Sequence, residues 1–347
     1  MNIAVVNTAV PFTRGGAEIH ADHLVTALNN AGHRAELVTI PFNWRTPWSI
    51  ADHLMAVRLM DIEYVNGISV DRVIGLRFPA YHIRHPNKVL WVIHQYRSAF
   101  DTWKHLNADL ASQQGGAALR NYISDEESEL LNKSAAVFTN SRNVSERMKR
   151  YCNFEAPPLY HPPGLADLLS PGEAEPFFLV PGRVERLKRP DLIVSALEKT
   201  QKPVQLVFAG QLDNSPNGKA IQKTIKRSSA RDRIQLLGYV RNTVLVDLYK
   251  RTRAVVYCPY DEDYGYVPLE AMLSQKPVIT TKDSGGCTEF VSGDNGWVCE
   301  PEVAAIAQAM DIAWESPLDC KKRGENGYAF YQSLNISWEH VVQTLMQ

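Results

Sequence analysis

The fold class of this chain is decided by the stretch IAVVNTAVPFTRGGAEIHADHLVTALNNAGHRAELVTI, residues 3–40. Ile3–Asn7 is a short apolar run, which is typical of a buried parallel strand. After a glycine loop, apolar residues recur at helical spacing from Ala17, and Gly32 suits the end of that helix. Glu36–Ile40 is the next apolar run, so the stretch predicts a βαβ unit with a right-handed crossover.

The alternation of strands and helices continues to the C-terminus and restarts near residue 175, after a linker over Tyr160–Gly164. We therefore predict an α/β chain of two doubly wound, Rossmann-like domains, over residues 1–165 and 166–335. Ligands on such sheets bind beyond the carboxyl ends of the strands, so a cleft between the domains is the expected site. The other predicted strands are Arg72–Gly75, Val89–Ile93, Ala136–Thr139, Phe177–Val180, Val204–Ala209, Ile234–Leu237, Ala254–Tyr257, Val278–Thr281 and Trp297–Cys299. Helices are predicted from Pro190 and around Thr243–Lys250, Pro268–Gln275, Thr288–Ser292, Ala304–Glu315 and Ile336–Met346.

The composition excludes several classes of protein. A chain of 347 residues is long enough for two domains, and a hydrophobic content of 45% excludes wholesale disorder. A formal net charge of -1 gives no bulk attraction to nucleic acid, so no nucleic-acid partner is expected; peripheral membrane contact is left open. The five cysteines form no C-x-x-C pair and the N-terminus has no signal-peptide pattern. We therefore expect reduced thiols in a cytoplasmic protein.

Two loops that follow predicted strands have anion-binding character. The first is Arg14-Gly15-Gly16 at the start of a helix, where free N–H groups can bind an anion; a plain tight turn is the alternative. The second, Pro181–Pro190, holds four cations in seven residues: Arg183, Arg186, Lys188 and Arg189. Such a loop suits a diphosphate, because Arg binds phosphate in bidentate fashion and Lys acts as a point charge; a solvated basic loop is the alternative.

A third loop, Tyr257–Met272, carries two carboxylates with seven residues between them, Glu262 in the loop and Glu270 in the following helix. Carboxylates accept paired hydrogen bonds from hydroxyl groups, so the two could hold a sugar and a ribose; an acidic surface loop is the alternative. Asp261-Glu262-Asp263 also matches the metal-binding pattern D-x-D. We expect no metal here, because the cationic loop already supplies the positive charge.

The histidines are unevenly distributed, since nine of the ten precede residue 162, and this asymmetry suggests that the two halves have different functions. His94 follows a predicted strand and lies at the edge where ligands bind, although a lone histidine is more often structural. His20 and His23 lie three residues apart on one predicted helix; they could share a ligand, but we expect them on the helix surface.

Together these motifs, in this order, resemble the retaining glycosyltransferases of family 4, which have the GT-B fold and are related to glycogen synthases. The resemblance covers essentially the whole chain. It is carried by the segment Glu262–Glu270 with its internal glycine and by the Gly-Gly-x-x-Glu of Gly285–Glu289. It implies that Arg183 and Lys188 grip the donor diphosphate. Glu270 would bind the ribose hydroxyls, and Glu262 would lie at the hydroxyls of the transferred sugar.

The resemblance also implies contacts from both domains. In the second domain, the backbone of Gly265, Tyr266 and Val267 would contact the phosphate or the sugar. A second turn, Gly238, Tyr239 and Val240, would contact the base. In the first domain, Gly15 and Gly16 would face the donor phosphates and the acceptor, and His94 would reach the sugar. The family often has an acid after this histidine, whereas this chain has Gln95. The C-terminal helix, about residues 336–347, is expected to pack back on the first domain.

The sequence therefore predicts a metal-independent, retaining glycosyltransferase without a cofactor, whose donor is a nucleoside-diphosphate sugar of the UDP or GDP type. The acceptor is expected to be a hydroxyl of a glycan, a lipid-linked sugar or a small molecule, in bacterial-type surface polysaccharide assembly. Five ring-bearing side chains in the first domain are candidates to stack on it, with buried core residues as the alternative: Trp44, Trp48, Tyr96, Trp103 and His105. Two alternatives stay open, a GT-B nucleotide-sugar epimerase or hydrolase and a catalytically degenerate binding scaffold.

Overall fold

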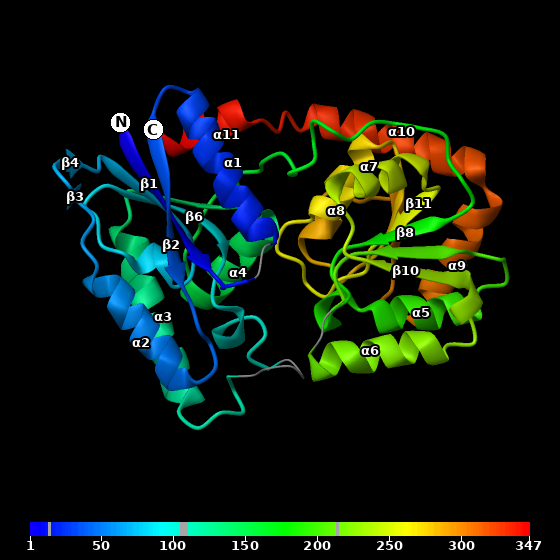
Figure 1. Cartoon of the computed structure of the whole chain (residues 1–347), viewed down its shortest axis with the longest axis horizontal. Coiled ribbons are helices and arrows are strands. Elements are labelled where there is room, and N and C mark those ends of the chain that lie inside the picture. The colour runs from blue at the N-terminus through cyan, green and yellow to red at the C-terminus, as the bar shows by residue number, and fades with distance from the viewer. Residues whose placement is uncertain (13–14, 105–109, 213–214) are drawn as a thin grey trace. The chain divides into compact units, whose positions relative to one another are not determined.

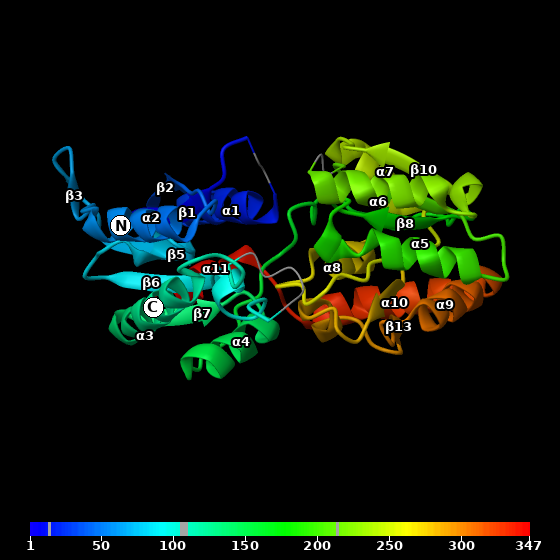
Figure 2. The same ribbon diagram turned by 90° about the horizontal axis from the view of Figure 1, so that it is seen from below.

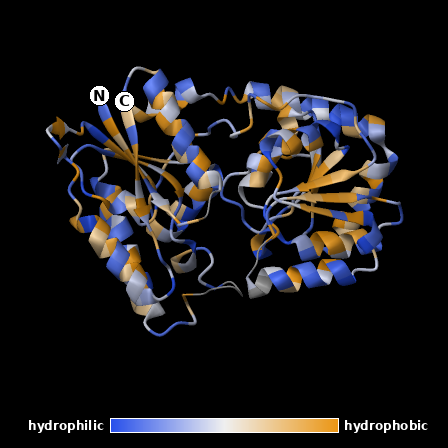
Figure 3. Cartoon of the chain, viewed as in Figure 1, coloured by the Kyte–Doolittle hydropathy of each residue, from blue (hydrophilic) through white to orange (hydrophobic). Residues whose placement is uncertain are grey.

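The computed structural model describes residues 1–12, 15–104, 110–212 and 215–347 (Figure 1). The chain divides into two compact units, residues 1–164 together with 337–347, and residues 165–336. In each unit a parallel sheet carries helices on both faces, and Figure 3 shows that apolar residues are concentrated in the strands. The doubly wound α/β architecture predicted from the sequence is confirmed.

The first unit is built on five parallel strands in the order β2-β1-β5-β6-β7, which the labels in Figure 2 follow from top to bottom. Chain order reverses between β1 and β5, so the loops after these strands flank the switch point. The strands are β1 Asn2–Ala9, β2 Arg34–Pro41, β5 Arg72–Arg77, β6 Lys88–His94 and β7 Ala136–Thr139, with a hairpin of β3 Tyr64–Val65 and β4 Ile68–Ser69. The helices are α1 Gly16–Asn30, α2 Pro47–Leu59, α3 Gly116–Lys133, α4 Arg142–Cys152 and α11 Trp338–Leu345.

Both faces of this sheet are covered by amphipathic helices (Figure 1). On one face, Leu24 and Leu28 of α1 share a buried cluster with Val341 and Leu345 of α11. On the other face, α2, α3 and α4 pack over the sheet through a second cluster. The Ser337 hydroxyl caps α11 by accepting the N–H of His340 at 3.1 Å. The end of the chain thus supplies part of the core of the first unit.

The second unit is built on six parallel strands in the order β10-β9-β8-β11-β12-β13. Its switch point lies between β8 and β11, so the loops that follow these two strands are neighbours at the carboxyl edge of the sheet. The strands are β8 Phe178–Pro181, β9 Leu206–Ala209, β10 Ile234–Gly238, β11 Ala254–Val256, β12 Val278–Thr281 and β13 Gly296–Cys299. The helices are α5 Pro190–Lys199, α6 Pro216–Arg227, α7 Asn242–Arg251, α8 Tyr266–Leu273, α9 Val303–Glu315 and α10 Pro317–Ser333.

The sequence patterns missed some elements and misjudged one. The helix predicted over Thr288–Ser292 is wrong, because the chain there forms only a 3-10 turn, Gly286–Glu289. Helices α2, α3, α4, α6 and α10 were not predicted. In α10 the reason is physical: a Cβ on Gly324 would lie 2.0 Å from the Gln275 carbonyl oxygen, so close packing requires a glycine inside the helix. No helix among the described residues combines the length and the apolar character needed to cross a membrane.

A buried aromatic cluster joins four segments of the first unit, and it includes two histidines. The His20 ring lies 4.3 Å from Trp91 of β6 and 4.2 Å from His161, whose ring lies 5.5 Å from Trp338 of α11. His161 Nδ1 donates to the Pro162 carbonyl at 3.1 Å, so its Nε2 accepts from His20 Nδ1 at 2.9 Å. His20 is only 2% exposed, so the prediction that it lies on the helix surface is wrong.

These histidines make the free energy of unfolding depend on pH. Burial lowers the pKa of His20 well below its usual value and that of His161 to about 3. In the unfolded chain these two histidines bind protons below about pH 6.5, whereas in the folded chain they stay neutral there. Their effect on the free energy of unfolding is therefore absent above about pH 6.5. Below it, each histidine lowers stability by about 1.4 kcal/mol per pH unit.

We expect His161→Gln to flatten the decline of stability between pH 6.5 and pH 4, because one proton-linked group is lost. Urea unfolding at several pH values measures this slope. The matched control is His340→Gln, since His340 is exposed on α11, and its slope should equal that of the parent protein. An unchanged slope in His161→Gln would contradict the assignment.

Candidate functional site

The switch point of the second unit brings Lys188 and Glu262 together. Lys188 ends the loop after β8, and Glu262 lies in the loop after β11. The Lys188 ammonium forms a direct ion pair with the Glu262 carboxylate, and both side chains are about four-fifths buried. The Tyr257 hydroxyl donates to Glu262 Oε2 at 3.2 Å, and Lys188 Nζ lies 5.4 Å from the centre of the Tyr257 ring. A phosphate that approaches Lys188 must therefore compete with a carboxylate of the protein itself.

The other cations of this loop have different surroundings. Arg183 is exposed, and its guanidinium lies 3.2 Å from the carboxylate of Glu185. Arg186 is exposed as well. Both can meet a solvent-borne anion, with little cost of desolvation.

Arg189 is directed into the protein, so the prediction that all four cations gather on a ligand is wrong for this residue. Its Nη1 and Nη2 each donate to one oxygen of Asp283 at 2.7 Å. Further bonds go from Nε to the Cys258 carbonyl at 2.8 Å and from Nη2 to the Pro259 carbonyl at 2.9 Å. Although burial acts to raise it, hydrogen bonds from Arg189 and Thr281 hold the pKa of Asp283 below its usual value. One guanidinium thus ties together the loops after β8, β11 and β12.

The loop that carries Glu262 is fixed along its backbone by the loop after β12. Glu262 N–H donates to the Ser284 carbonyl at 3.2 Å, and Gly286 N–H donates to the Glu262 carbonyl at 2.8 Å. The two backbones are so close that a Cβ on Gly286 would lie 2.4 Å from the Tyr264 carbonyl oxygen. Gly286 is therefore required by packing.

Glu270 lies one turn into α8, a helix that Gly265 enters with φ of 114°. The residue as a whole is half-buried, and its carboxylate accepts a hydrogen bond from the Tyr249 hydroxyl at 2.7 Å. Burial raises the pKa of Glu270 to about 7, and the bond from Tyr249 acts in the opposite direction. This carboxylate can therefore change its protonation state near neutral pH.

The residues predicted to give backbone contacts lie at two separate turns. Gly265 and Tyr266 begin α8, whereas the side chain of Val267 is 8% exposed and belongs to the core, so only its backbone can face a ligand. Gly238 ends β10 with φ of 68°. After it, Tyr239 is 76% exposed, while Val240 packs against the same core cluster as Val267. Tyr239 thus offers an exposed aromatic face beside the carboxyl edge.

In the first unit, the glycine loop carries its own carboxylate. Gly16 begins α1, and the Gly15 N–H donates to Glu18 Oε2 at 2.8 Å. The other oxygen of Glu18 accepts from Arg77 Nη1 at 3.1 Å. The N–H group that the sequence assigned to an anion is thus occupied by a side chain of the same helix, which the motif did not reveal. Arg14 and His105 lie outside the described residues.

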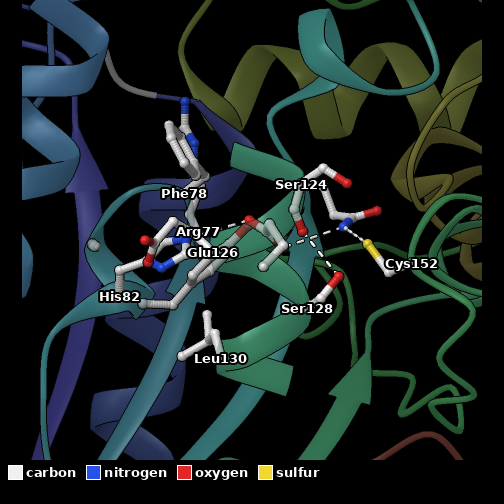
Figure 4. A network of polar contacts seen from close by, with 12 residues as sticks. Arg77, Phe78, His82, Ser124, Glu126, Ser128, Leu130 and Cys152 are labelled. Atoms are coloured by element: carbon white, nitrogen blue, oxygen red, sulfur yellow. Dashed lines mark hydrogen bonds and ion pairs between the residues drawn. The ribbon is translucent and has the colours of Figure 1, made fainter. Parts of the chain in front are cut away.

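His94 ends β6, and its Nδ1 donates to the Gln95 carbonyl at 2.7 Å. The Gln95 amide is buried and donates to Glu127 Oε2 at 3.2 Å and to Cys152 Sγ at 3.1 Å (Figure 4). Glu127, on α3, is 1% exposed and also accepts from the Tyr81 hydroxyl. A buried carboxylate therefore lies next to Gln95, although residue 95 itself carries none.

The aromatic acceptor candidates of the first unit differ in exposure. Trp44 is 45% and Trp48 is 73% exposed, whereas Tyr96 packs on Phe78 with ring centres 5.2 Å apart. Trp103 lies under the guanidinium of Arg120, 4.8 Å from the ring centre. Among the described residues, no group of three or more His, Cys, Asp or Glu side chains is placed to hold a metal ion.

Part of the chain matches a known protein family. Residues 169–330 match the family described as "Glycosyl transferases group 1". The chain is 27% identical over 204 residues to Alpha-1,3/1,6-mannosyltransferase ALG2 of Dictyostelium discoideum, covering 53% of this chain and 47% of that protein. It thus matches less than half the length of this curated relative.

Several solved structures match the whole chain, and two of them illustrate the likeness. Sucrose-phosphate synthase from Thermosynechococcus elongatus has a TM-score of 0.79 at 17% identity and covers 100% of this chain and 97% of that one. Anabaena Alr3699/HepE, solved in complex with UDP and glucose, has a TM-score of 0.69 at 15% identity and covers 100% and 98%. At these identities the likeness shows the fold alone.

We expect Gly286→Ala to destabilise the second unit by about 1–3 kcal/mol, because the added methyl group overlaps the Tyr264 carbonyl. The midpoint of urea unfolding measures the change. Gly293→Ala is the control, since a Cβ there meets nothing within 4 Å, and its effect should stay below about 0.5 kcal/mol. If Gly286→Ala and Gly293→Ala unfold at the same urea concentration, the close contact between Gly286 and Tyr264 is contradicted.

We expect Arg189→Lys to lower stability by about 2 kcal/mol, because an ammonium cannot replace the bidentate fork to Asp283 or its carbonyl bonds. The exposed Arg186, in the same loop, provides the control Arg186→Lys, for which a change below about 0.5 kcal/mol is expected. If the midpoint of thermal unfolding shifts by the same amount in both variants, the bonds of Arg189 do not stabilise the three loops.

Proposed function

We propose that this chain, which matches a glycosyltransferase family over residues 169–330 and has the fold of solved glycosyltransferases, moves a sugar from a nucleoside-diphosphate sugar to a hydroxyl group, with retention of configuration. The observation that carries the proposal is the Lys188–Glu262 ion pair at the switch point of the second unit. This pair joins a cation suited to phosphate and a carboxylate suited to sugar hydroxyls, at the sheet edge where ligands bind.

The donor diphosphate binds to Lys188 and Arg183 in this proposal. Cleavage of the anomeric bond leaves additional negative charge on the diphosphate, and cations fixed in place stabilise it without reorganisation. Lys188 is held in position through its neighbour Arg189, and Arg183 is accessible from solvent. Because this loop supplies the charge compensation, the proposed reaction is independent of a metal ion and needs no cofactor.

Glu262 changes partner when the donor binds. In the structure it is neutralised by Lys188; a diphosphate at Lys188 would release its carboxylate to accept the hydroxyls of the transferred sugar. For retention, we propose attack of the acceptor on the same face as the leaving group, with the departing phosphate oxygen taking the acceptor proton. The C–O bond to phosphate breaks as the C–O bond to the acceptor forms.

The nucleoside of the donor is assigned to Glu270 and to the turn after β10, also in the second unit. Glu270 would accept the ribose hydroxyls, and the turn Gly238, Tyr239 and Val240 would lie against the base. The structure of Alr3699/HepE with UDP supports a nucleoside diphosphate as ligand of this fold, and the base in this chain is proposed as uracil or guanine.

The acceptor is assigned to the first unit, at the carboxyl edge that carries Gly15, Gly16 and His94. Its class is a hydroxyl of a glycan, a lipid-linked sugar or a small molecule, and the mannosyltransferase relative supports a carbohydrate. The five cysteines are free thiols, which suits a reducing compartment, so we propose that the reaction takes place in the cytoplasm.

We expect Lys188→Ala and Glu262→Ala each to lower the rate of sugar transfer by about 100-fold or more, because each removes a charge at the reacting bond. Release of UDP or GDP from a panel of nucleotide sugars measures the rate. The control is Lys282→Ala, since this exposed lysine pairs with Glu300 in the same unit and should leave the rate unchanged.

Three results would count against this proposal. Unchanged transfer in both site variants would overturn the site. Release of nucleotide without any glycosylated product would indicate a hydrolase or epimerase. Absence of thermal stabilisation by UDP or GDP would indicate a binding scaffold of another kind, since a bound ligand must stabilise the folded state.

We expect the transfer rate to change by less than about twofold after the protein is treated with EDTA and returned to metal-free buffer, because the cationic loop replaces a metal ion. Addition of Mg²⁺ or Mn²⁺ to the treated protein provides the comparison. A loss of activity with EDTA that Mn²⁺ restores would overturn the metal-independent mechanism.

A further inference from the structure

Tyr249 lies on α7, a helix to which the sequence motifs assign no role in the site. Its ring is 0% exposed and belongs to the core cluster that also holds Ala271 of α8 and Val255 of β11. Its hydroxyl donates a hydrogen bond to Glu270 Oε2 at 2.7 Å. A buried phenol needs such a partner, and here the partner is the carboxylate proposed for the ribose.

We propose that Tyr249 is a positioning residue for donor binding, because it fixes the Glu270 carboxylate in the orientation and ionisation state that receive the ribose hydroxyls. The inference rests on the proposed function, since it assumes that Glu270 binds the donor. Tyr249 itself is buried behind Glu270 in the core and acts through it.

The hydrogen-bond capacity of Glu270 suits this arrangement. An ionised carboxylate has two oxygens with about four acceptor sites, and the Tyr249 hydroxyl occupies one of them on Oε2. The remaining sites can accept two neighbouring hydroxyl groups. A protonated Glu270 would lose one acceptor site and would present a donor instead, which matches two hydroxyls less well.

The ionisation of Glu270 depends on Tyr249. Burial raises the pKa of Glu270 to about 7, and the hydrogen bond from Tyr249 acts to lower it. Conversely, burial and then Glu270 raise the pKa of Tyr249 well above its usual value, so the phenol keeps its proton. Loss of this hydroxyl would therefore leave Glu270 protonated over a wider range of pH.

One other group close to α8 titrates in the same range: burial lowers the pKa of Lys276, just after α8, to about 8, and its ammonium donates to the Gly172 carbonyl at 2.7 Å. Three other phenols and one thiol lie on α8 or on elements near it, and burial is the main cause that raises the pKa of each. These are Tyr266 on α8, Tyr257 after β11, Cys287 in the 3-10 turn after β12 and Tyr331 on α10. The charge of Glu262 raises the pKa further for Tyr266, Tyr257 and Cys287. The charged neighbours, Glu262 and Lys188, are paired with each other.

The substitution Tyr249→Phe removes only the hydroxyl, and its effect is measured as binding of UDP and of GDP by calorimetry at pH 6, 7, 8 and 9. We expect the dissociation constant at pH 7 to rise about tenfold, because a hydrogen bond to a charged group is lost. At pH 9 it should return to within about threefold of the parent value, because Glu270 then ionises without help.

Two control variants separate positioning from stability. Tyr331→Phe changes another buried tyrosine of the same unit, which is 8% exposed on α10, and should leave the pH profile of binding unchanged. Glu270→Gln removes the titrating group, so its affinity should be low at every pH and should not recover at pH 9. Thermal unfolding of each variant without nucleotide records any change in folding.

The outcomes distinguish the inference from the function on which it rests. Recovery of affinity at high pH in Tyr249→Phe alone supports the positioning role. An equal loss at pH 7 and pH 9, or an unchanged dissociation constant, overturns it. If the parent protein binds neither UDP nor GDP, the proposed function fails, and this inference fails with it.

Discussion

The hydrogen-bond fork between Arg189 and Asp283 is the interaction on which the candidate site of the second unit depends. Parallel strands bring loops to one edge of the sheet, but loops at an edge are not fixed by the sheet itself. Arg189 fixes them by joining the segments after β8, β11 and β12 through one planar group. Lys188 is the preceding residue, so its distance to Glu262 follows from this bond network.

A second property of the candidate site of the second unit is that several of its charges are already paired without a ligand, since Lys188 pairs with Glu262 and Arg183 lies against Glu185. The glycine loop of the first unit, taken by itself, is similar, because Glu18 occupies the Gly15 N–H and pairs with Arg77. Ligand binding at such a site is an exchange of partners rather than a simple addition. Its free energy is smaller than the new contacts alone suggest, because existing ion pairs must break. In return, no isolated charge is left buried in the free protein.

The histidines of the first unit illustrate how a composition signal can mislead. The sequence placed nine of ten histidines before residue 162, which suggested a functional difference between the halves. In the structure, His20 and His161 are core residues that pack on Trp91 and Trp338. Their neutral rings form part of the cluster that joins α11 to the first unit. A hydrogen-bonded imidazole pair can serve as a core element, and residue type alone does not reveal this.

The sequence by itself determined the α/β class, most strand positions and the motif residues, because strand periodicity and glycine loops are local patterns. Strands such as Ala136–Thr139 and Val278–Thr281 were predicted with their observed bounds. Only the tertiary structure decided that Arg189 turns inward, that Arg77 pairs with Glu18, and that Tyr249 meets Glu270. These partners are separated by up to 94 residues, or belong to different elements. Such pairings are set by how the elements pack, and a local pattern carries no information about them.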